Sequence, residues 1–324
     1  MNDDPNVADT TRASVLDIVA RERFVPNRSA RGLASGRTGV IGIVVSAELA
    51  NLFGDPYFAV LLQAVYDAAR AKSLVLSLWL PEADDAASID QIVRGSTLDG
   101  VLIAAESADD PLVLELVETQ KPSVLIGRSE EHDGISYVDV DNRAAGRTAT
   151  EHLIGLGRTR IATIAGPLHS VASADRLVGY EDALNAAGLG VDDDLVRRGD
   201  FSAASAVAAI PDLRRAGLDA IVAANDAMAV AAMAELQAGG VSIPGDVAVI
   251  GMDDLPIAAA AQPALSTMRQ PIRAVAVEAV DLLNTLIADN TAAPTRVVMQ
   301  TELVIRESCG GSPEVNRGLG ATSS

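Results

Sequence analysis

The sequence contains very few cysteine, histidine and aromatic residues. Cys309 is the one cysteine among 324 residues, which excludes an internal disulfide framework and a cysteine metal cluster. No apolar run approaches the roughly 18–20 residues of a membrane span, and the first 30 residues have no apolar signal-peptide core. We therefore expect a soluble, cytoplasmic protein that makes no membrane contact.

The motifs of several common enzyme classes are also absent. The chain has no G-x-x-x-x-G-K-[ST], G-x-G-x-x-G or G-x-S-x-G, and its histidines, His132, His152 and His169, lack metal-ligand spacing. Asp253 and Asp254 form a poor glycosidase pair, because adjacent acids point in different directions. We expect a protein that is not an enzyme, with no catalytic residue, no bound metal and no cofactor.

Positive charge is scarce except in one short segment. The net charge is −19, but five arginines and a single glutamate lie between Arg21 and Arg37. An acidic protein is repelled by a polyanion, so any nucleic-acid contact must use this segment. The alternative is an arginine-rich, solvated linker.

Apolar residues make up 49% of the chain and occur in runs of strand length between segments of helical periodicity. The runs are continuous, which is typical of parallel strands covered on both faces. We expect strands at 40–45, 74–80, 100–104, 123–126, 161–165, 220–224 and 247–250. We expect helices at 58–72, 111–120, 143–154, 174–187, 202–216, 227–237 and 272–288. This alternation predicts an α/β fold.

Two segments look like the starts of equivalent halves. They are GVIGIVVS at 39–46 and RIATIAGP at 160–167, and each opens a series of strands and helices. So many units favour two doubly wound parallel-sheet lobes over one wide sheet. A single (β/α)₈ barrel is the alternative. Ligands of open α/β sheets bind beyond the carboxyl ends of the strands, so we seek binding residues there.

The N-terminal segment follows a different pattern. DTT at 9–11 is suited to cap a helix that runs to about Arg23. The apolar stripe of this helix needs a partner, because an isolated helix of this length is marginal in water. Either it docks elsewhere, or the sequence starts inside a small helical domain. Residues 32–39 then form a linker, and the Gly/Ser-rich tail at 311–324 is expected to be disordered.

Short motifs then appear in a characteristic order along the chain. They are PNRSARGL (26–33), RTG (37–39), DPYF (55–58), DVDN (139–142), HLIGLG (152–157), SADRLVGY (173–180), AAND (223–226), IGMDD (250–254) and PALST (263–267). Their order and spacing resemble the LacI/GalR family of ligand-responsive transcriptional repressors over about residues 6 to 308. The resemblance implies two periplasmic-binding-protein-like lobes of type I, preceded by a partial helical DNA-binding segment.

The same resemblance implies a division of the chain. Residues 1–37 are a headpiece remnant and hinge helix, and 311–324 are the tail. The N-terminal lobe comprises 38–154 and 269–295, and the C-terminal lobe comprises 155–268 and 296–310. The family begins with a helix-turn-helix, whereas the match here opens near its third helix. A misplaced start codon is the simplest explanation, and a truncated protein that does not read DNA is the alternative.

Residues 27–33 correspond to the hinge helix of the family, which folds on DNA. Leu33 then enters the minor groove as a wedge, and Arg28 and Arg31 lie near phosphates or groove edges. Asn27 and Ala30 complete the expected DNA-binding set. A segment this short cannot hold a helix alone, so its folding awaits a partner. A plain linker is the alternative.

Two charged residues are candidates for binding a ligand. Asp141 precedes a helix, so it either caps that helix or presents its carboxylate to ligand hydroxyls. Arg176 is expected in the first turn of the 174–187 helix, where a cation opposes the helix dipole. Such an arginine needs a specific partner, and its fork of donors suits vicinal hydroxyls or a carboxylate. The family match also places effector binding at Arg176.

Two strand ends supply further candidates. After the 220–224 strand, Asp226 is the expected helix cap and Asn225 offers a donor and an acceptor to the ligand. After the 247–250 strand, Asp254 is the expected cap and Asp253 the ligand carboxylate. The set of aspartate, arginine and asparagine side chains favours a sugar over a nucleobase.

Three of the few aromatic residues follow expected strands. Tyr57, Phe58 and Phe201 are placed to stack on the apolar face of a sugar or on a flat base. Core packing is the alternative for Phe58. We expect a homodimeric, sugar-sensing repressor that binds operator DNA. The alternative is a sugar-binding sensor without sequence-specific DNA binding.

Overall fold

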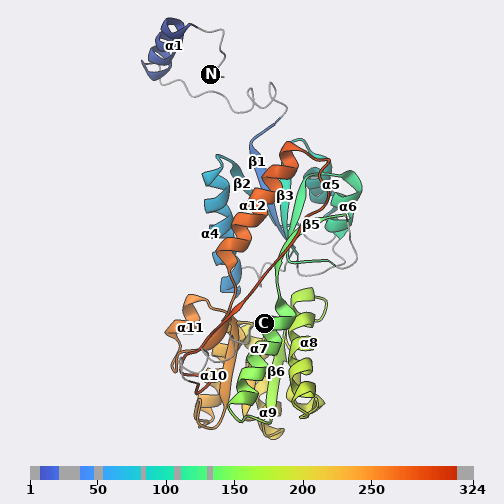
Figure 1. Cartoon of the computed structure of the whole chain (residues 1–324), viewed down its shortest axis with the longest axis vertical. Coiled ribbons are helices and arrows are strands. Elements are labelled where there is room, and N and C mark those ends of the chain that lie inside the picture. Colours follow the sequence, from blue (N-terminus) through green and yellow to red (C-terminus); the bar gives the residue numbers. More distant parts are fainter. Residues whose placement is uncertain are drawn as a thin grey trace, which may run out of the picture.

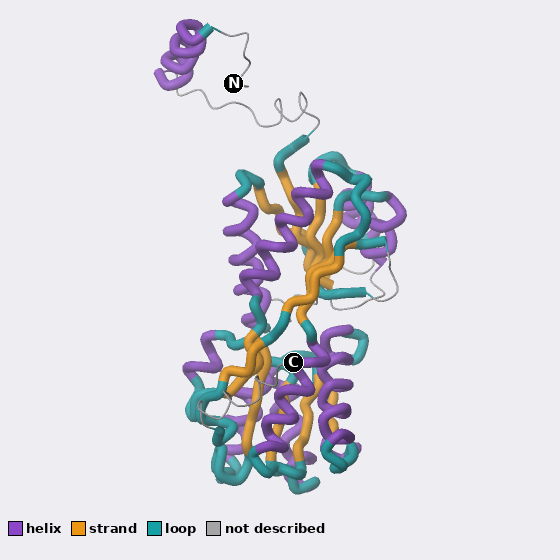
Figure 2. The backbone as a smooth tube through the Cα atoms, in the orientation of Figure 1, coloured by secondary structure: helices purple, strands orange, loops and turns teal. Residues whose placement is uncertain are grey.

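The computed structural model describes residues 8–21, 37–46, 54–81, 85–105, 111–129 and 134–311. Within these ranges the chain forms two lobes, each built on a six-stranded sheet (Figures 1 and 2). The strand orders are β11-β5-β4-β3-β1-β2 and β12-β10-β9-β8-β6-β7. Both sheets are open, so the prediction of two doubly wound lobes is confirmed and the barrel alternative is wrong.

The first lobe has helices on both faces of its sheet. Its strands are parallel and comprise β1 (Val40–Ser46), β2 (Val75–Trp79), β3 (Gly100–Ala105), β4 (Ser123–Ile126), β5 (Ser136–Val140) and β11 (Arg296–Met299). Its helices are α4 (Pro56–Ala71), α5 (Ala86–Arg94), α6 (Pro111–Thr119) and α12 (Ile272–Ala288). On β1, Ile41 and Ile43 pack toward α4 and α12, whereas Val44 packs toward α5 and α6. The strand is continuously apolar because successive side chains enter two different cores.

The second lobe repeats this arrangement. Its strands are β6 (Ile161–Ala165), β7 (Val196–Arg198), β8 (Ala220–Ala223), β9 (Ala248–Asp253), β10 (Ser266–Arg269) and the antiparallel β12 (Glu302–Val304). Its helices are α7 (Asn142–Gly155), α8 (Val171–Ala186), the 3₁₀ turn η1 (Asp193–Leu195), α9 (Ala203–Arg215), α10 (Asp226–Ala238) and α11 (Pro256–Ala260). One core lies between the sheet, α9 and α10, and another between the sheet, α7 and α8.

Two of the three points at which the chain passes between the lobes differ from those we expected. α7 was assigned to the first lobe, but it buries Ala145, Ala149 and Leu153 against α8 and the second sheet. Residues 296–299 were assigned to the second lobe, but they form β11, which pairs with β5 of the first. The crossovers therefore follow β5, β10 and β11. The decisive contacts are long-range packing and strand pairing, which local periodicity does not encode.

The N-terminal helix α1 (Asp9–Arg21) lies apart from both lobes in Figure 1. The side chain of Ile18, on its predicted apolar stripe, is half exposed. The expected DNA-binding residues Asn27, Arg28, Ala30, Arg31 and Leu33 lie outside the described residues, as does nearly all of the predicted tail. None of the helices in the described part of the chain is both long and apolar enough to span a bilayer.

Candidate functional site

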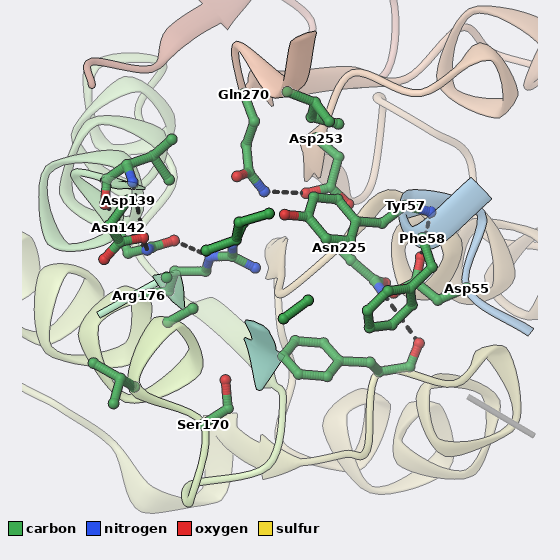
Figure 3. Close-up of a pocket in the computed structure, with 18 of the residues that line it drawn as sticks. Asp55, Tyr57, Phe58, Asp139, Asn142, Ser170, Arg176, Asn225, Asp253 and Gln270 are labelled. Atoms are coloured by element: carbon green, nitrogen blue, oxygen red, sulfur yellow. Dashed lines mark hydrogen bonds between the residues drawn. The ribbon is translucent and has the colours of Figure 1, made fainter. Parts of the chain in front are cut away.

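A cavity of about 390 Å³ lies between the two lobes, at the carboxyl ends of strands from both sheets. Its volume is in the range of small-molecule binding pockets. Figure 3 shows polar side chains from both lobes directed into it. The polar lining residues are Asp55, Tyr57, Arg128, Asp139, Asn142, Ser170, Arg176, Asp200, Ser202, Asn225, Asp253 and Gln270.

Arg176 projects from α8 into this cavity (Figure 3). Its Nε donates to Asn142 Oδ1 at 2.9 Å, and its Nη1 donates to the Ala224 carbonyl at 2.7 Å. The salt bridges of the described residues include none to Arg176, so its remaining N–H groups are placed to donate to a ligand. α8 begins at Val171 rather than 174, so Arg176 lies in the second turn and the helix-dipole argument was wrong.

Two glycines bring α7 and α8 into backbone contact and so place Arg176 beside Asn142. A Cβ on Gly146 would lie 2.1 Å from the Arg176 carbonyl oxygen. A Cβ on Gly179 would lie 2.1 Å from the Arg143 carbonyl oxygen. Any larger residue at either position forces the helices apart. The arginine is thus positioned by helix packing as well as by its own hydrogen bonds.

Asn225 connects the lobes at the N-terminus of α10. Its Oδ1 accepts from the Met228 N–H at 2.8 Å, which makes Asn225 the helix cap. Its Nδ2 donates to Asp55 Oδ2 in the first lobe at 3.1 Å and to the Phe201 carbonyl at 3.0 Å. The expectation that Asp226 caps α10 is therefore wrong, because the cap is Asn225. Asn225 also lines the cavity, and its role in ligand binding stays a prediction. Asp226 is buried and accepts from Thr267 Oγ1 and the Leu255 N–H.

Asp253 ends β9 with its side chain at the cavity and its backbone at a φ of +114°. Non-glycine residues rarely adopt positive φ, and such strain is concentrated at functional sites. Gln270 Nε2 donates to Asp253 Oδ1 at 2.5 Å, and burial raises the pKa of the Asp253 carboxyl. We expected Asp254 to cap α11, and this expectation is wrong. Asp254 instead pairs with Arg269 and Arg306.

Three acids that the sequence analysis did not single out also line the cavity, namely Asp200 and the two described next. Asp55 caps α4, and Asp139 lies near the end of β5 and accepts from Asn142 Nδ2 at 3.2 Å. Burial raises the pKa of the Asp55 and Asp139 carboxyls. Asp141 instead accepts from the Ala144 N–H as the cap of α7 and is not among the lining residues. The structure thus supports the capping alternative for Asp141 and does not bring this residue to the cavity.

Signals for the missed residues were present in two motifs. Asp55 opens DPYF, and Asp139 and Asn142 flank DVDN. Asp139 lies within β5, whereas Asp141 follows the strand and caps α7, and the sequence pattern alone does not show where the strand ends. Gln270 follows β10, whose sequence STMR is not a continuous apolar run and was therefore not recognised as a strand.

The aromatic residues enclose the apolar part of the cavity. Tyr57 and Phe58 lie in the first turn of α4 rather than in a loop, and their rings meet edge to face with centroids 5.6 Å apart. Phe58 also belongs to the core of the first lobe. Phe201, at a φ of +67°, covers Gly166, where a Cβ would lie 2.4 Å from the ring. All three line the cavity together with aliphatic side chains.

The arrangement is suited to binding a small polar molecule. Within the described ranges, no group of three or more His, Cys, Asp or Glu side chains is arranged to hold a metal ion. His152 has a structural position, because its Nε2 contacts the Cys309 sulfur at 3.5 Å. The cavity offers carboxylate acceptors, amide groups and two guanidinium groups around an aromatic surface. These are the groups that bind a small hydroxylated molecule.

Comparison with known proteins agrees with this architecture. Residues 150–309 match the periplasmic binding protein-like domain family. The HTH-type transcriptional regulator CelR of Thermobifida fusca is 38% identical over 313 residues, which cover 95% of this chain and 92% of that protein. The HTH-type transcriptional regulator GalR of Escherichia coli is 29% identical, covering 100% of this chain and 94% of that protein.

Solved structures show the same likeness. A CelR–cellobiose complex has a TM-score of 0.78 and 37% identity, covering 94% of this chain and 92% of that chain. A Lac repressor dimer bound to operator has a TM-score of 0.83 at 24% identity, covering 95% of this chain and 92% of that chain, and it supports the fold alone. On these grounds, the chain belongs to the LacI/GalR family of transcriptional regulators.

Proposed function

We propose that the chain is a cytoplasmic, sugar-responsive repressor that binds operator DNA as a homodimer. The observation that carries the proposal is the cavity between the lobes. Buried aspartates from both lobes surround the Arg176 guanidinium, and aromatic rings cover the adjacent apolar surface. Closure of two lobes on a ligand changes their relative arrangement, so a bound sugar favours one arrangement in proportion to its differential affinity.

The charges at the cavity favour a neutral sugar over a phosphorylated one. Four carboxylates and two guanidinium groups line it, from Asp55, Asp139, Asp200, Asp253, Arg128 and Arg176. Arg128 already pairs with Asp139 and Asp175. An anionic group therefore enters a site with excess negative charge, whereas hydroxyl groups donate to the carboxylates. Cellobiose is the first sugar to test, because the related CelR was solved in complex with it.

Isothermal titration calorimetry tests the ligand. We expect cellobiose or another neutral sugar of a small panel to bind, and glucose 6-phosphate to bind far more weakly. Arg176→Ala and Asp253→Ala are expected to abolish measurable binding, while Asp141→Ala, which alters only the cap of α7, leaves it unchanged. Full affinity in the first two variants contradicts the assignment of the cavity.

A gel-shift assay tests the DNA partner. We expect the chain to bind a fragment from upstream of its own gene and the sugar to change that affinity. Light scattering is expected to give twice the mass of one chain. If no fragment binds while the sugar does, the protein is a sugar-binding sensor without sequence-specific DNA binding.

A further inference from the structure

An ion pair crosses the cleft on one side of the cavity. Asp175 lies on α8 in the second lobe, and its carboxylate pairs with the guanidinium of Arg128, which follows β4 in the first lobe. The two side chains are only 16% and 21% exposed. Arg128 also lies 3.5 Å from the Asp139 carboxylate in its own lobe. One guanidinium thus joins a cavity acid of the first lobe to an acid of the second.

A second polar contact between the lobes lies on the other side of the cavity. It is the hydrogen bond from Asn225 Nδ2 to Asp55 Oδ2 at 3.1 Å. Figure 3 places Asp55 and Asp139 on opposite sides of the pocket, so the two contacts hold both sides of the cleft. Asn225 also caps α10 and lines the cavity, whereas Asp175 is not among the lining residues. Asp175 can therefore be altered without removing a group from the cavity wall.

We propose that Asp175 is a positioning residue for effector binding, which acts through Arg128 to hold the two lobes together around the ligand. The proposal rests on the proposed function of the cavity. A partly buried charge pair with little solvent screening is stronger than an exposed one. When the pair is lost, fewer molecules have the closed cavity. Because apparent affinity scales with the fraction of binding-competent protein, it falls even though the groups lining the cavity are unchanged.

The same helix supplies a matched control. Asp182 is also on α8 and pairs with Arg143 Nε at 2.7 Å, but Arg143 belongs to α7 in the same lobe. Asp175→Asn and Asp182→Asn make the same chemical change in one helix. The first removes an ion pair between the lobes, and the second removes one within a lobe.

Calorimetry with cellobiose, or with the panel sugar that binds the unmodified chain, compares these variants. We expect Asp175→Asn to lower affinity about tenfold and Asp182→Asn to leave it unchanged. Raising the salt concentration from about 0.05 to about 0.5 M is expected to weaken binding to the unmodified chain more than to Asp175→Asn, because only the former has the ion pair to screen. Equal affinities and equal salt dependence in the two variants overturn the proposal.

Small-angle X-ray scattering of the ligand-free chain separates this proposal from the proposed function. The ion pair is present without a ligand, so Asp175→Asn is expected to increase the radius of gyration and Asp182→Asn is not. If no sugar binds but Asp175→Asn still opens the lobes, the function proposed for the cavity fails and the role of Asp175 in closure stands. If the scattering curves of all three proteins coincide, the role of Asp175 is refuted.

Discussion

Replacing Gly146 by alanine tests whether contact between α7 and α8 positions the cavity arginine. The new Cβ would lie 2.1 Å from the Arg176 carbonyl oxygen, a backbone atom that cannot rotate away. Overpacking against such a rigid group is expected to destabilise the fold by about 3 kcal/mol, the upper end of the usual range. Alanine has a higher helix propensity than glycine, which stabilises the folded state by about 1 kcal/mol and offsets part of this loss. We therefore expect a net loss of roughly 2 kcal/mol in the free energy of unfolding.

Gly155→Ala is the matched control, because Gly155 ends the same helix and its Cβ would meet no atom within 4 Å. This variant is expected to be about 0.5–1 kcal/mol more stable than the parent. Urea denaturation measures the free energy of unfolding of both variants. The slope of this free energy against urea concentration is expected to be unchanged. Gly146→Ala is also expected to weaken sugar binding, because the displaced α8 carries Arg176. Equal stability of the two variants would falsify the proposed helix contact.

Three further predictions concern single side chains. Asp141→Ala removes the cap of α7. Chemical denaturation should show a loss of about 1 kcal/mol in the free energy of unfolding, with sugar affinity unchanged. A loss of sugar affinity would mean that Asp141 takes part in binding. Asn225→Ala removes a cap and leaves buried partners unsatisfied, so we expect a loss of at least about 2 kcal/mol; a smaller loss contradicts the bonding described. Burial raises the pKa of Asp226 from 3.8 to about 7. The folded chain therefore binds more protons than the unfolded chain between these values, and stability falls as the pH rises through that interval. Asp226→Asn should flatten this dependence in denaturation at about pH 5.5 and about pH 8, and an unchanged slope rules out Asp226 as its source.

Most core strands were predictable, because their side chains enter two cores and their sequences are therefore continuously apolar. The strands β5 and β10 are mostly buried but contain polar residues, and they were missed. The 123–126 and 161–165 runs coincide with β4 and β6, and the predicted 272–288 helix coincides with α12. Short or edge strands were missed: β7 and β12 have three residues each, and their side chains are largely half-buried or exposed. A run of three residues carries too little periodicity to be distinguished from a turn.

The cavity was only partly predictable. Arg176, Asn225 and Asp253 were named from their positions beyond strands or near helix starts, and all three line the cavity. Asp141 satisfied the same criterion but points to its own helix, because local capping and ligand binding use the same kind of side chain. Whether such a carboxylate caps its own helix or faces the cavity depends on the direction in which its side chain points. The neighbouring residues in the sequence do not specify this direction.

The sequence by itself determined the α/β class, the two halves and the family, because these follow from the order of apolar runs and short motifs along one chain. Only the tertiary structure decided which lobe holds α7 and β11, which acids face the cavity, and that Asp175 meets Arg128 across the cleft. The physical reason is distance along the chain. Residues 47 positions apart come together only when both lobes have folded and their helices have packed, and no local pattern records that contact.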